Sequence, residues 1–266
     1  MPRALLIAWK AIAYCVGFLL VAAACVQAWF YAQVFWWNTH NPTSTSFMQT
    51  RLEQLRHKDR SAKLKHQWLP YESMPVHLKR AVVASEDAKF VGHEGFDWEA
   101  IQKAMEKNER KGRVVAGAST ISQQLAKNLF LSGERSWVRK AQEAAITWML
   151  ESVMSKRRIL EIYLNVAEWG DGVFGAEAAA RHHFGIPARS LSAQQAAWLA
   201  AILPSPLRYS RGQSTAYLRE RVAVIQSRMQ QARIPLQSPS DRLHRCSGVD
   251  VRALACWREY SRSSCW

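Results

Sequence analysis

The chain has 266 residues, carries a formal net charge of +15 and is 48% hydrophobic. This length accommodates one substantial domain with appendages, and the surplus of positive charge favours an anionic partner such as anionic lipid or a phosphorylated substrate. Zinc-finger spacing, RNA-binding aromatic signatures and basic heptads are missing from the sequence, which argues against nucleic acid as a partner.

Residues 11–30 form an uncharged apolar run, interrupted only by Gly17 and Gln27, that is long enough to cross a bilayer as a helix. Basic residues precede the run and none follows it until Arg51, so the positive-inside rule places the N-terminus in the cytoplasm and the rest of the chain outside. A cleaved signal peptide is the alternative, but its apolar core is normally shorter, about 7–15 residues. We expect residues 1–37 to hold a retained transmembrane anchor that tethers the chain to its membrane.

Three further regions follow the anchor. Residues 38–67 are a polar, charged and partly helical connector. Residues 68–235 show helical periodicity with almost no alternation of period two, so the globular part is predicted to be mainly α. Residues 236–266 lose this periodicity and are predicted to be a disordered tail; their three cysteines leave at least one thiol unpaired or intermolecular.

The helices of the globular part are predicted from apolar spacing and from their start and stop signals. Thr120 followed by Gln123 is a capping-box pattern at a helix start, and Gly112 is a stop signal. The segment 68–75 is predicted to be extended because it contains two prolines. The predicted helices cover residues 76–90, 97–112, 120–131, 136–154, 156–169, 176–185, 192–203 and 215–234.

Two adjacent carboxylates, Glu86 and Asp87, follow an apolar run and precede His93. Glu86 lies near the C-terminal end of its predicted helix, where the helix dipole disfavours negative charge. The neighbouring Asp87 charge and partial burial add to this effect, so all three raise the pKa of Glu86 toward that of a general base at neutral pH. An isolated acidic pair is more commonly a solvated helix cap, so the pair alone does not distinguish a general base from such a cap.

A polar stripe follows on the predicted helix 120–131. Thr120, Gln124 and Lys127 are spaced to lie on one face, and the exposed N–H groups of a helix start are an anion site. A hydroxyl, an amide and an ammonium in line suit a phosphate. From this segment alone, an ordinary polar helix face is equally possible.

A third cluster places Arg135, Arg139, Lys140 and Glu143 within nine residues. Arg139 and Glu143 have the spacing of an intrahelical ion pair. The functional alternative is a second carboxylate held in a basic frame that neutralises an anionic leaving group.

Five short motifs in this order resemble those of the peptidoglycan glycosyltransferases, and the likeness covers residues 68–211. With one anchor and no room for a transpeptidase domain, the chain is similar to the monofunctional biosynthetic members found in Gram-negative bacteria. The motifs read EDAKFVGHEG, GASTISQQLAKN, RKAQE, KRRILEIYLN and GAEAAARHHFG.

The resemblance implies a lysozyme-like, two-lobed helical fold and an inverting reaction. Lipid II is polymerised into β-1,4-linked glycan strands, and undecaprenyl pyrophosphate is released. The implied location is the bacterial inner membrane, crossed once, with the catalytic domain in the periplasm. The implied partners are lipid II, the growing glycan chain and membrane lipid, with cell-division or elongation proteins as further candidates.

The resemblance also implies roles for individual residues. Glu86 is expected to be the general base and Glu143 a second catalytic carboxylate. No cofactor is required, although a divalent cation, Mg²⁺ or Mn²⁺, near Glu143 stays open. The expected substrate-binding residues are Asp87, Phe90, His93, Ser119, Thr120, Gln123, Gln124, Lys127, Asn128, Arg135, Arg139 and Lys140.

Two other function classes compete with this interpretation. A lysozyme-like lytic glycosidase shares the fold type and a catalytic glutamate, but it needs a protonated acid at the glycosidic oxygen rather than a cationic frame. A non-enzymatic, membrane-anchored cell-wall scaffold has no need to bring carboxylates and cations together in this order.

Overall fold

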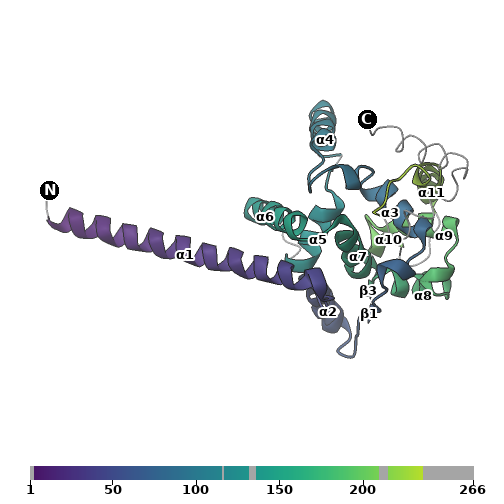
Figure 1. Cartoon of the computed structure of the whole chain (residues 1–266), viewed down its shortest axis with the longest axis horizontal. Helices are drawn as coiled ribbons and strands as arrows, with labels where there is room; N and C mark the ends of the chain where they lie inside the picture. Colours follow the sequence, from purple (N-terminus) through teal and green to yellow (C-terminus); the bar gives the residue numbers. More distant parts are fainter. Residues whose placement is uncertain (1–2, 116, 132–135, 210–214, 236–266) are drawn as a thin grey trace, which may run out of the picture.

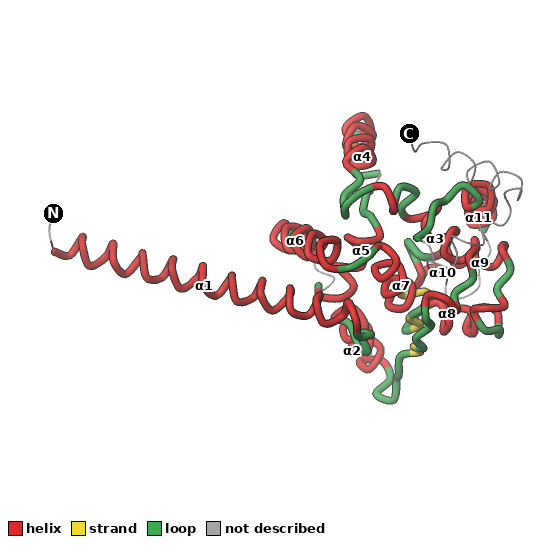
Figure 2. Tube along the Cα trace, in the orientation of Figure 1, coloured by secondary structure: helices red, strands yellow, loops and turns green. Residues whose placement is uncertain are grey.

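The computed structural model describes residues 3–115, 117–131, 136–209 and 215–235. The described chain is mainly helical, which confirms the predicted fold class (Figures 1 and 2). The α-helices are α1 (Arg3–Thr39), α2 (Ser46–Lys58), α3 (Val76–Glu86), α4 (Trp98–Lys111), α5 (Ile121–Phe130), α6 (Trp137–Val153), α7 (Lys156–Val166), α8 (Ala176–Phe184), α9 (Ala193–Ile202), α10 (Pro206–Tyr209) and α11 (Ala216–Met229).

A small sheet, which the sequence analysis did not predict, lies beside these helices. Its strands are β1 (Lys65–His66), β2 (Glu168–Gly170) and β3 (Val173–Phe174), in the order β1-β3-β2. The central β3 pairs in parallel with β1 and antiparallel with β2. Strands of two or three residues are too short to show alternation, and β2 takes residues that we expected to extend helix α7.

Helix α1 runs outward from the body, and only its C-terminal part lies against the other helices (Figure 1). Its segment Trp9–Thr39 contains an 18-residue stretch with a mean hydropathy of 2.1 and is long and apolar enough to cross a membrane. With 37 residues, the helix is about 55 Å long, well beyond the roughly 30 Å of a bilayer's hydrocarbon core.

Two groups of helices form the body. Helices α3, α9 and α11 pack together, while α5 packs against α2, α6 and α7. They bury one continuous core, whose largest side chains include Trp169, Tyr71 and Tyr163. The groups meet where the end of α3 reaches the start of α5, because the carboxylate of Asp87 accepts a hydrogen bond from the backbone N–H of Ile121 at 3.0 Å.

Several predicted boundaries are confirmed. Gly112 ends α4 in the left-handed conformation, at φ +59°, and Thr120 with Gln123 forms the capping box of α5. The apolar face predicted for residues 215–234 is buried in α11. The connector contains helix α2, which packs against α5.

Two other local predictions were wrong. The helix predicted for residues 76–90 stops at Glu86, because Asp87 leaves the helical conformation, at φ −163° and ψ 76°, and its carboxylate accepts from the N–H of Ile121 at the start of α5. The chain then forms a single 3₁₀ turn at Phe90–Gly92. A second 3₁₀ turn, Tyr71–Ser73, replaces part of the extended segment predicted for residues 68–75.

Candidate active site

Glu86 is the last residue of α3, and its side chain is 8% exposed. The hydroxyl of Ser85 lies 3.0 Å from its Oε1, and one Arg221 nitrogen lies 3.8 Å from the same oxygen. Burial raises the pKa of the Glu86 carboxyl above its ordinary value, while its hydrogen bonds and the Arg221 charge oppose the shift. The carboxylate is therefore desolvated and only weakly compensated by a cation.

Gln124 on α5 connects Glu86 to Tyr163 on α7. Its amide Nε2 donates to Glu86 Oε2 at 3.1 Å, and its Oε1 accepts from the Tyr163 hydroxyl at 2.8 Å. Burial holds the pKa of Tyr163 well above its ordinary value, so the phenol stays protonated and remains a donor. This chain of donors fixes the amide orientation of Gln124 and aims its N–H at the carboxylate.

Asp87 and His93 form a pair behind Glu86. Asp87 is 7% exposed, and its carboxylate oxygens lie 2.9 and 3.1 Å from His93 Nε2. Since the carboxylate accepts, the imidazole hydrogen belongs on Nε2. The same carboxylate accepts from the N–H of Ile121 at the positive end of α5. Asp87 therefore joins three segments of the chain and positions Glu86.

Thr120 and Gln123 are occupied in holding the start of α5. The Thr120 hydroxyl donates to the Gly95 carbonyl at 2.6 Å and accepts from the backbone N–H of Gln123 at 3.2 Å. The Gln123 side chain returns a bond to the backbone N–H of Thr120. Gly95 has φ +88°, and a Cβ there would lie 2.8 Å from a methyl group of Thr147. The junction therefore requires glycine.

Glu143 on α6 is also buried, with a side chain that is 5% exposed. Its Oε2 accepts from Arg139 at 3.2 Å, and its Oε1 is paired with the Lys140 ammonium. The predicted intrahelical pair is present, and a second cation completes it. In contrast to Glu86, this carboxylate has a cation at each oxygen.

Lys127 lies one turn beyond Gln124 on α5. Burial lowers the pKa of its ammonium below the ordinary lysine value, the Glu143 charge opposes this shift, and the Arg139 charge adds to it. Within the described parts of the chain, Lys127 makes no salt bridge. Its charge is therefore available to an anionic ligand.

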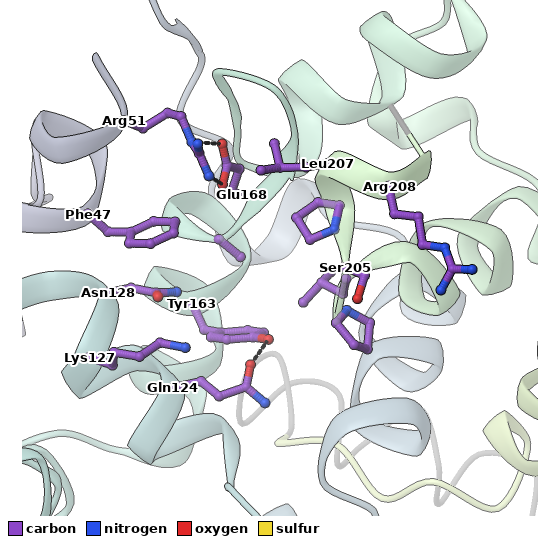
Figure 3. A pocket seen from close by; sticks show the side chains of 14 residues that line it. Phe47, Arg51, Gln124, Lys127, Asn128, Tyr163, Glu168, Ser205, Leu207 and Arg208 are labelled. Carbon is purple, nitrogen blue, oxygen red and sulfur yellow. Dashed lines mark hydrogen bonds and ion pairs between the residues drawn. The ribbon is translucent and has the colours of Figure 1, made fainter. Parts of the chain in front are cut away.

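A cavity of about 430 Å³ lies between the α2–α5–α7 side and the turn from α9 into α10, as Figure 3 shows. Gln124, Lys127 and Asn128 line one wall, and Ser205 and Arg208 line the other. Its volume is in the range of small-ligand sites. Glu86 does not itself line the cavity; Gln124 contacts both.

Three cations and one carboxylate line this cavity. The cations are Arg51, Lys127 and Arg208, and the carboxylate is Glu168. Arg51 binds Glu168 through two hydrogen bonds of 2.7 and 3.0 Å (Figure 3). Burial raises the pKa of Glu168, and the Arg51 charge opposes that shift. The excess of positive charge suits an anionic ligand.

The other predicted site residues are distributed as follows. Phe90 is fully buried, with the Lys156 ammonium 4.7 Å from its ring centroid, so it packs in the core. Asn128 is 8% exposed and lines the cavity, whereas Ser119 is exposed before α5. Arg135 lies outside the described residues.

Sequence reasoning missed five residues that shape the site: Arg51, Ser85, Tyr163, Glu168 and Arg221. Tyr163 stood within the fourth motif, so its position was visible but its role was not. Arg221 lies on the polar side of an amphipathic helix, where a charge looks like an ordinary solvated group. No signal in the sequence connected it to Glu86.

The residues around Glu143 do not fit a divalent cation. Both carboxylate oxygens already accept from cations, and Lys127 adds a third positive charge nearby. Among the residues that the structure describes, no group of three or more His, Cys, Asp or Glu side chains could hold a metal ion.

Comparison with known sequences places these residues in a wider context. The sequence profile of the family described as Transglycosylase matches residues 51–230. A biosynthetic peptidoglycan transglycosylase of Azoarcus sp. (strain BH72) is 65% identical over 185 residues, which cover 70% of this chain and 80% of that protein. The protein of the same name from Nitrosospira multiformis is 59% identical over 218 residues, covering 82% of this chain and 95% of that protein. The profile match includes Glu86, Glu143 and their contacts with α5, α7 and α11.

Proposed function

Because this chain belongs to the transglycosylase family, we propose that it polymerises lipid II into β-1,4-linked glycan strands with release of undecaprenyl pyrophosphate. The observation that carries the proposal is the buried carboxylate of Glu86, held by Gln124, which also lines the cavity that contains Lys127. A base with a raised pKa beside a cation that makes no salt bridge within the described residues is what this group transfer needs.

Glu86 acts as the general base. As the 4-hydroxyl oxygen of the acceptor sugar attacks C1 of the donor, its proton passes to the Glu86 carboxylate. The new C1–O4 bond forms on the face opposite the departing pyrophosphate oxygen, so an α-linked donor gives a β-linked product. Burial supports this role because it raises the affinity of Glu86 for a proton.

The cations stabilise the leaving group. As the C1–O bond breaks, negative charge grows on the pyrophosphate, and Lys127, Arg139 and Lys140 offset it. Glu143 keeps Arg139 and Lys140 in place before substrate binds. Arg135 is part of the same proposal from the sequence, although it lies outside the described residues.

Several predicted binding residues act mainly by positioning. His93 and Asp87 hold the loop behind Glu86, while Thr120 and Gln123 hold the start of α5. Gln124 and Asn128 face the cavity and are proposed to contact the sugar portion of the substrate.

The reaction is proposed to need no resident cofactor. The cation-filled surroundings of Glu143 disfavour Mg²⁺ or Mn²⁺ there, and the ammonium and guanidinium groups supply the charge. Turnover that survives thorough chelation by EDTA supports this arrangement; full loss with recovery on adding Mg²⁺ contradicts it.

The proposed location is the bacterial inner membrane, crossed once by α1, with the N-terminus cytoplasmic and the catalytic domain periplasmic. The apolar segment Trp9–Thr39 and the distribution of basic residues support this orientation. The proposed partners at this location are lipid II, the growing strand and membrane lipid, and cell-division or elongation proteins are further candidates.

Incubation of the purified full-length protein with lipid II in detergent tests the proposal. Polymeric glycan that a muramidase digests is the expected product. Cleavage of preformed glycan without polymerisation would identify a lytic glycosidase, and neither activity would identify a scaffold. Either of these outcomes overturns the proposed function.

A further inference from the structure

Gln27 is the one strongly polar side chain in the apolar run of residues 11–30. It lies on the face of α1 that meets the body. Phe30, Val34 and Trp37 continue this face at helical spacing, and Val34 is fully buried. The polar residue therefore occurs where the anchor first contacts the catalytic domain.

Gln27 is paired with Gln142 on α6. Its Nε2 donates to Gln142 Oε1 at 2.8 Å, and Gln142 Nε2 donates back to Gln27 Oε1 at 3.1 Å. Each amide thus gives and receives one hydrogen bond. Because both bonds are directional, the pair fixes the rotation of one helix relative to the other more closely than apolar contact does.

The apolar surroundings of this pair make the loss of its hydrogen bonds unfavourable. Ala28, Tyr31, Phe35 and Met149 line an apolar groove of about 550 Å³ next to Gln27. An amide left without a partner in apolar surroundings is unfavourable, and polar pairs between membrane helices favour their association. Separation of the two helices therefore leaves both amides unsatisfied.

Helix α6, which carries Gln142, also carries Arg139, Lys140 and Glu143. Gln142 immediately precedes the buried Glu143 and lies one turn after Arg139. The end of the anchor is held separately, since the Arg158 guanidinium donates to the carbonyl of Trp37 at 3.0 and 2.9 Å. Near the same end, the ring of Phe130 packs against Phe30. The anchor is thus fixed to α5, α6 and α7 at several points.

We propose that Gln27 is a positioning residue, which acts through Gln142 to hold α6 and its Glu143 frame in the productive orientation. The anchor is then a supporting element of the catalytic centre as well as a membrane tether. The activity readout of this inference rests on the proposed polymerase function, whereas the coupling between the helices can be measured without it.

The test uses full-length protein in detergent, where tethering to a vesicle plays no part. Gln27→Leu, Gln142→Leu and the double variant remove the pair. Gln33→Leu on the same helix is the matched control, since Gln33 makes no side-chain hydrogen bond within the described residues. We expect each single variant to lower kcat about tenfold with little change in KM, and the double variant to lose no more than either single one. Gln33→Leu should keep wild-type kcat.

Hydrogen exchange of α6 separates the two proposals. Faster exchange over residues 139–149 in Gln27→Leu, but not in Gln33→Leu, supports the coupling even if the wild-type protein makes no polymer. Unchanged exchange, or wild-type kcat in both single variants, overturns the positioning role. Losses that multiply in the double variant also overturn it, because the two amides then act independently.

Discussion

Glu86 and Glu143 are similarly buried, yet their surroundings differ. The side chains are 8% and 5% exposed, respectively. Glu86 receives hydrogen bonds from a neutral amide and a neutral hydroxyl, with one guanidinium nitrogen at 3.8 Å. Glu143 has a guanidinium at one oxygen and an ammonium at the other.

The difference shows that counter-charge, rather than burial, distinguishes these two carboxylates. An uncompensated carboxylate gains affinity for a proton when it is desolvated, whereas cations at both oxygens favour the ionised form. Glu86 is suited to accept a proton during the reaction. Glu143 is suited to hold Arg139 and Lys140 through its two oxygens.

The largest effect is expected from Glu86→Gln. The amide keeps the shape of the side chain but cannot accept the proton, so turnover should fall about 100- to 10,000-fold. Polymerisation rate with purified lipid II is the measurement. Retention of more than about a tenth of the wild-type rate would remove Glu86 from the role of base.

The same variant carries a stability prediction with a defined sign. A raised pKa means that folded protein holds the Glu86 proton more tightly than unfolded protein does. The free energy of unfolding therefore falls as pH rises from the ordinary glutamate pKa through the raised one. Glu86→Gln should unfold at a higher temperature than wild type at neutral pH, and this advantage should vanish in acid. A lower Tm at neutral pH contradicts it.

Lys127→Ala should have the next largest effect, because it removes a cation that we place beside the leaving group. A loss of about 100-fold in turnover is typical of removing one such stabilising group. Lys107→Ala, at an exposed position on α4, is the control. Because the pKa of Lys127 is lowered, wild-type turnover should decline on the alkaline side as the ammonium loses its proton, and Lys127→Arg should delay that decline. Wild-type turnover and substrate affinity in Lys127→Ala would show that Lys127 takes no part in substrate binding or catalysis.

Glu143→Gln should act mainly through its cations. Arg139 and Lys140 lose their shared anion, and hydrogen bonds to charged groups are worth about 1.5–3 kcal/mol, less where solvent reaches the Lys140 ammonium. We expect a lower Tm and a loss of about tenfold in turnover, compared with Glu109→Gln on the exposed α4. A loss as large as that of Glu86→Gln, without any change in Tm, would mean that both carboxylates act in the chemistry.

Arg221→Gln should have the smallest effect. It removes the cation that opposes the pKa shift of Glu86, so the acid limb of kcat/KM should move to higher pH while turnover above that limb is retained. Arg228→Gln, an exposed position on the same helix, should leave the profile unchanged. An acid limb that stays in place in Arg221→Gln would show that Arg221 does not tune the base.

Local signals predicted much of the fold. The capping box at Thr120, the stop at Gly112 and the apolar face of α11 each depend on residues within a few positions of one another. The sheet was not predicted because its central strand β3 pairs with β1, which lies more than 100 residues away in the sequence. The early end of α3 was not predicted for the same reason, because it depends on a distant contact: Asp87 leaves the helix and accepts from the N–H of Ile121.

The candidate site shows the same difference between residues predicted from local motifs and residues brought in from distant parts of the chain. The motifs identified Glu86, Gln124 and Lys127; Gln124 and Lys127 line the cavity, and Gln124 also donates to the buried Glu86 carboxylate. The residues that tune them come from distant helices; the Arg221 guanidinium reaches Ser85 across 136 positions of sequence. A polar helix face read from sequence does not reveal which of its charges faces the body.

The hydrogen bond from Ile121 to Asp87 also provides a natural reporter. This amide proton is bound by the side chain of Asp87, which follows α3, rather than by a helix carbonyl. Its exchange with solvent deuterium therefore measures how often the loop behind Glu86 lifts from α5, independently of unfolding of the helix itself. A ligand that holds this loop against α5 should slow this one proton more than the amides deeper in α5.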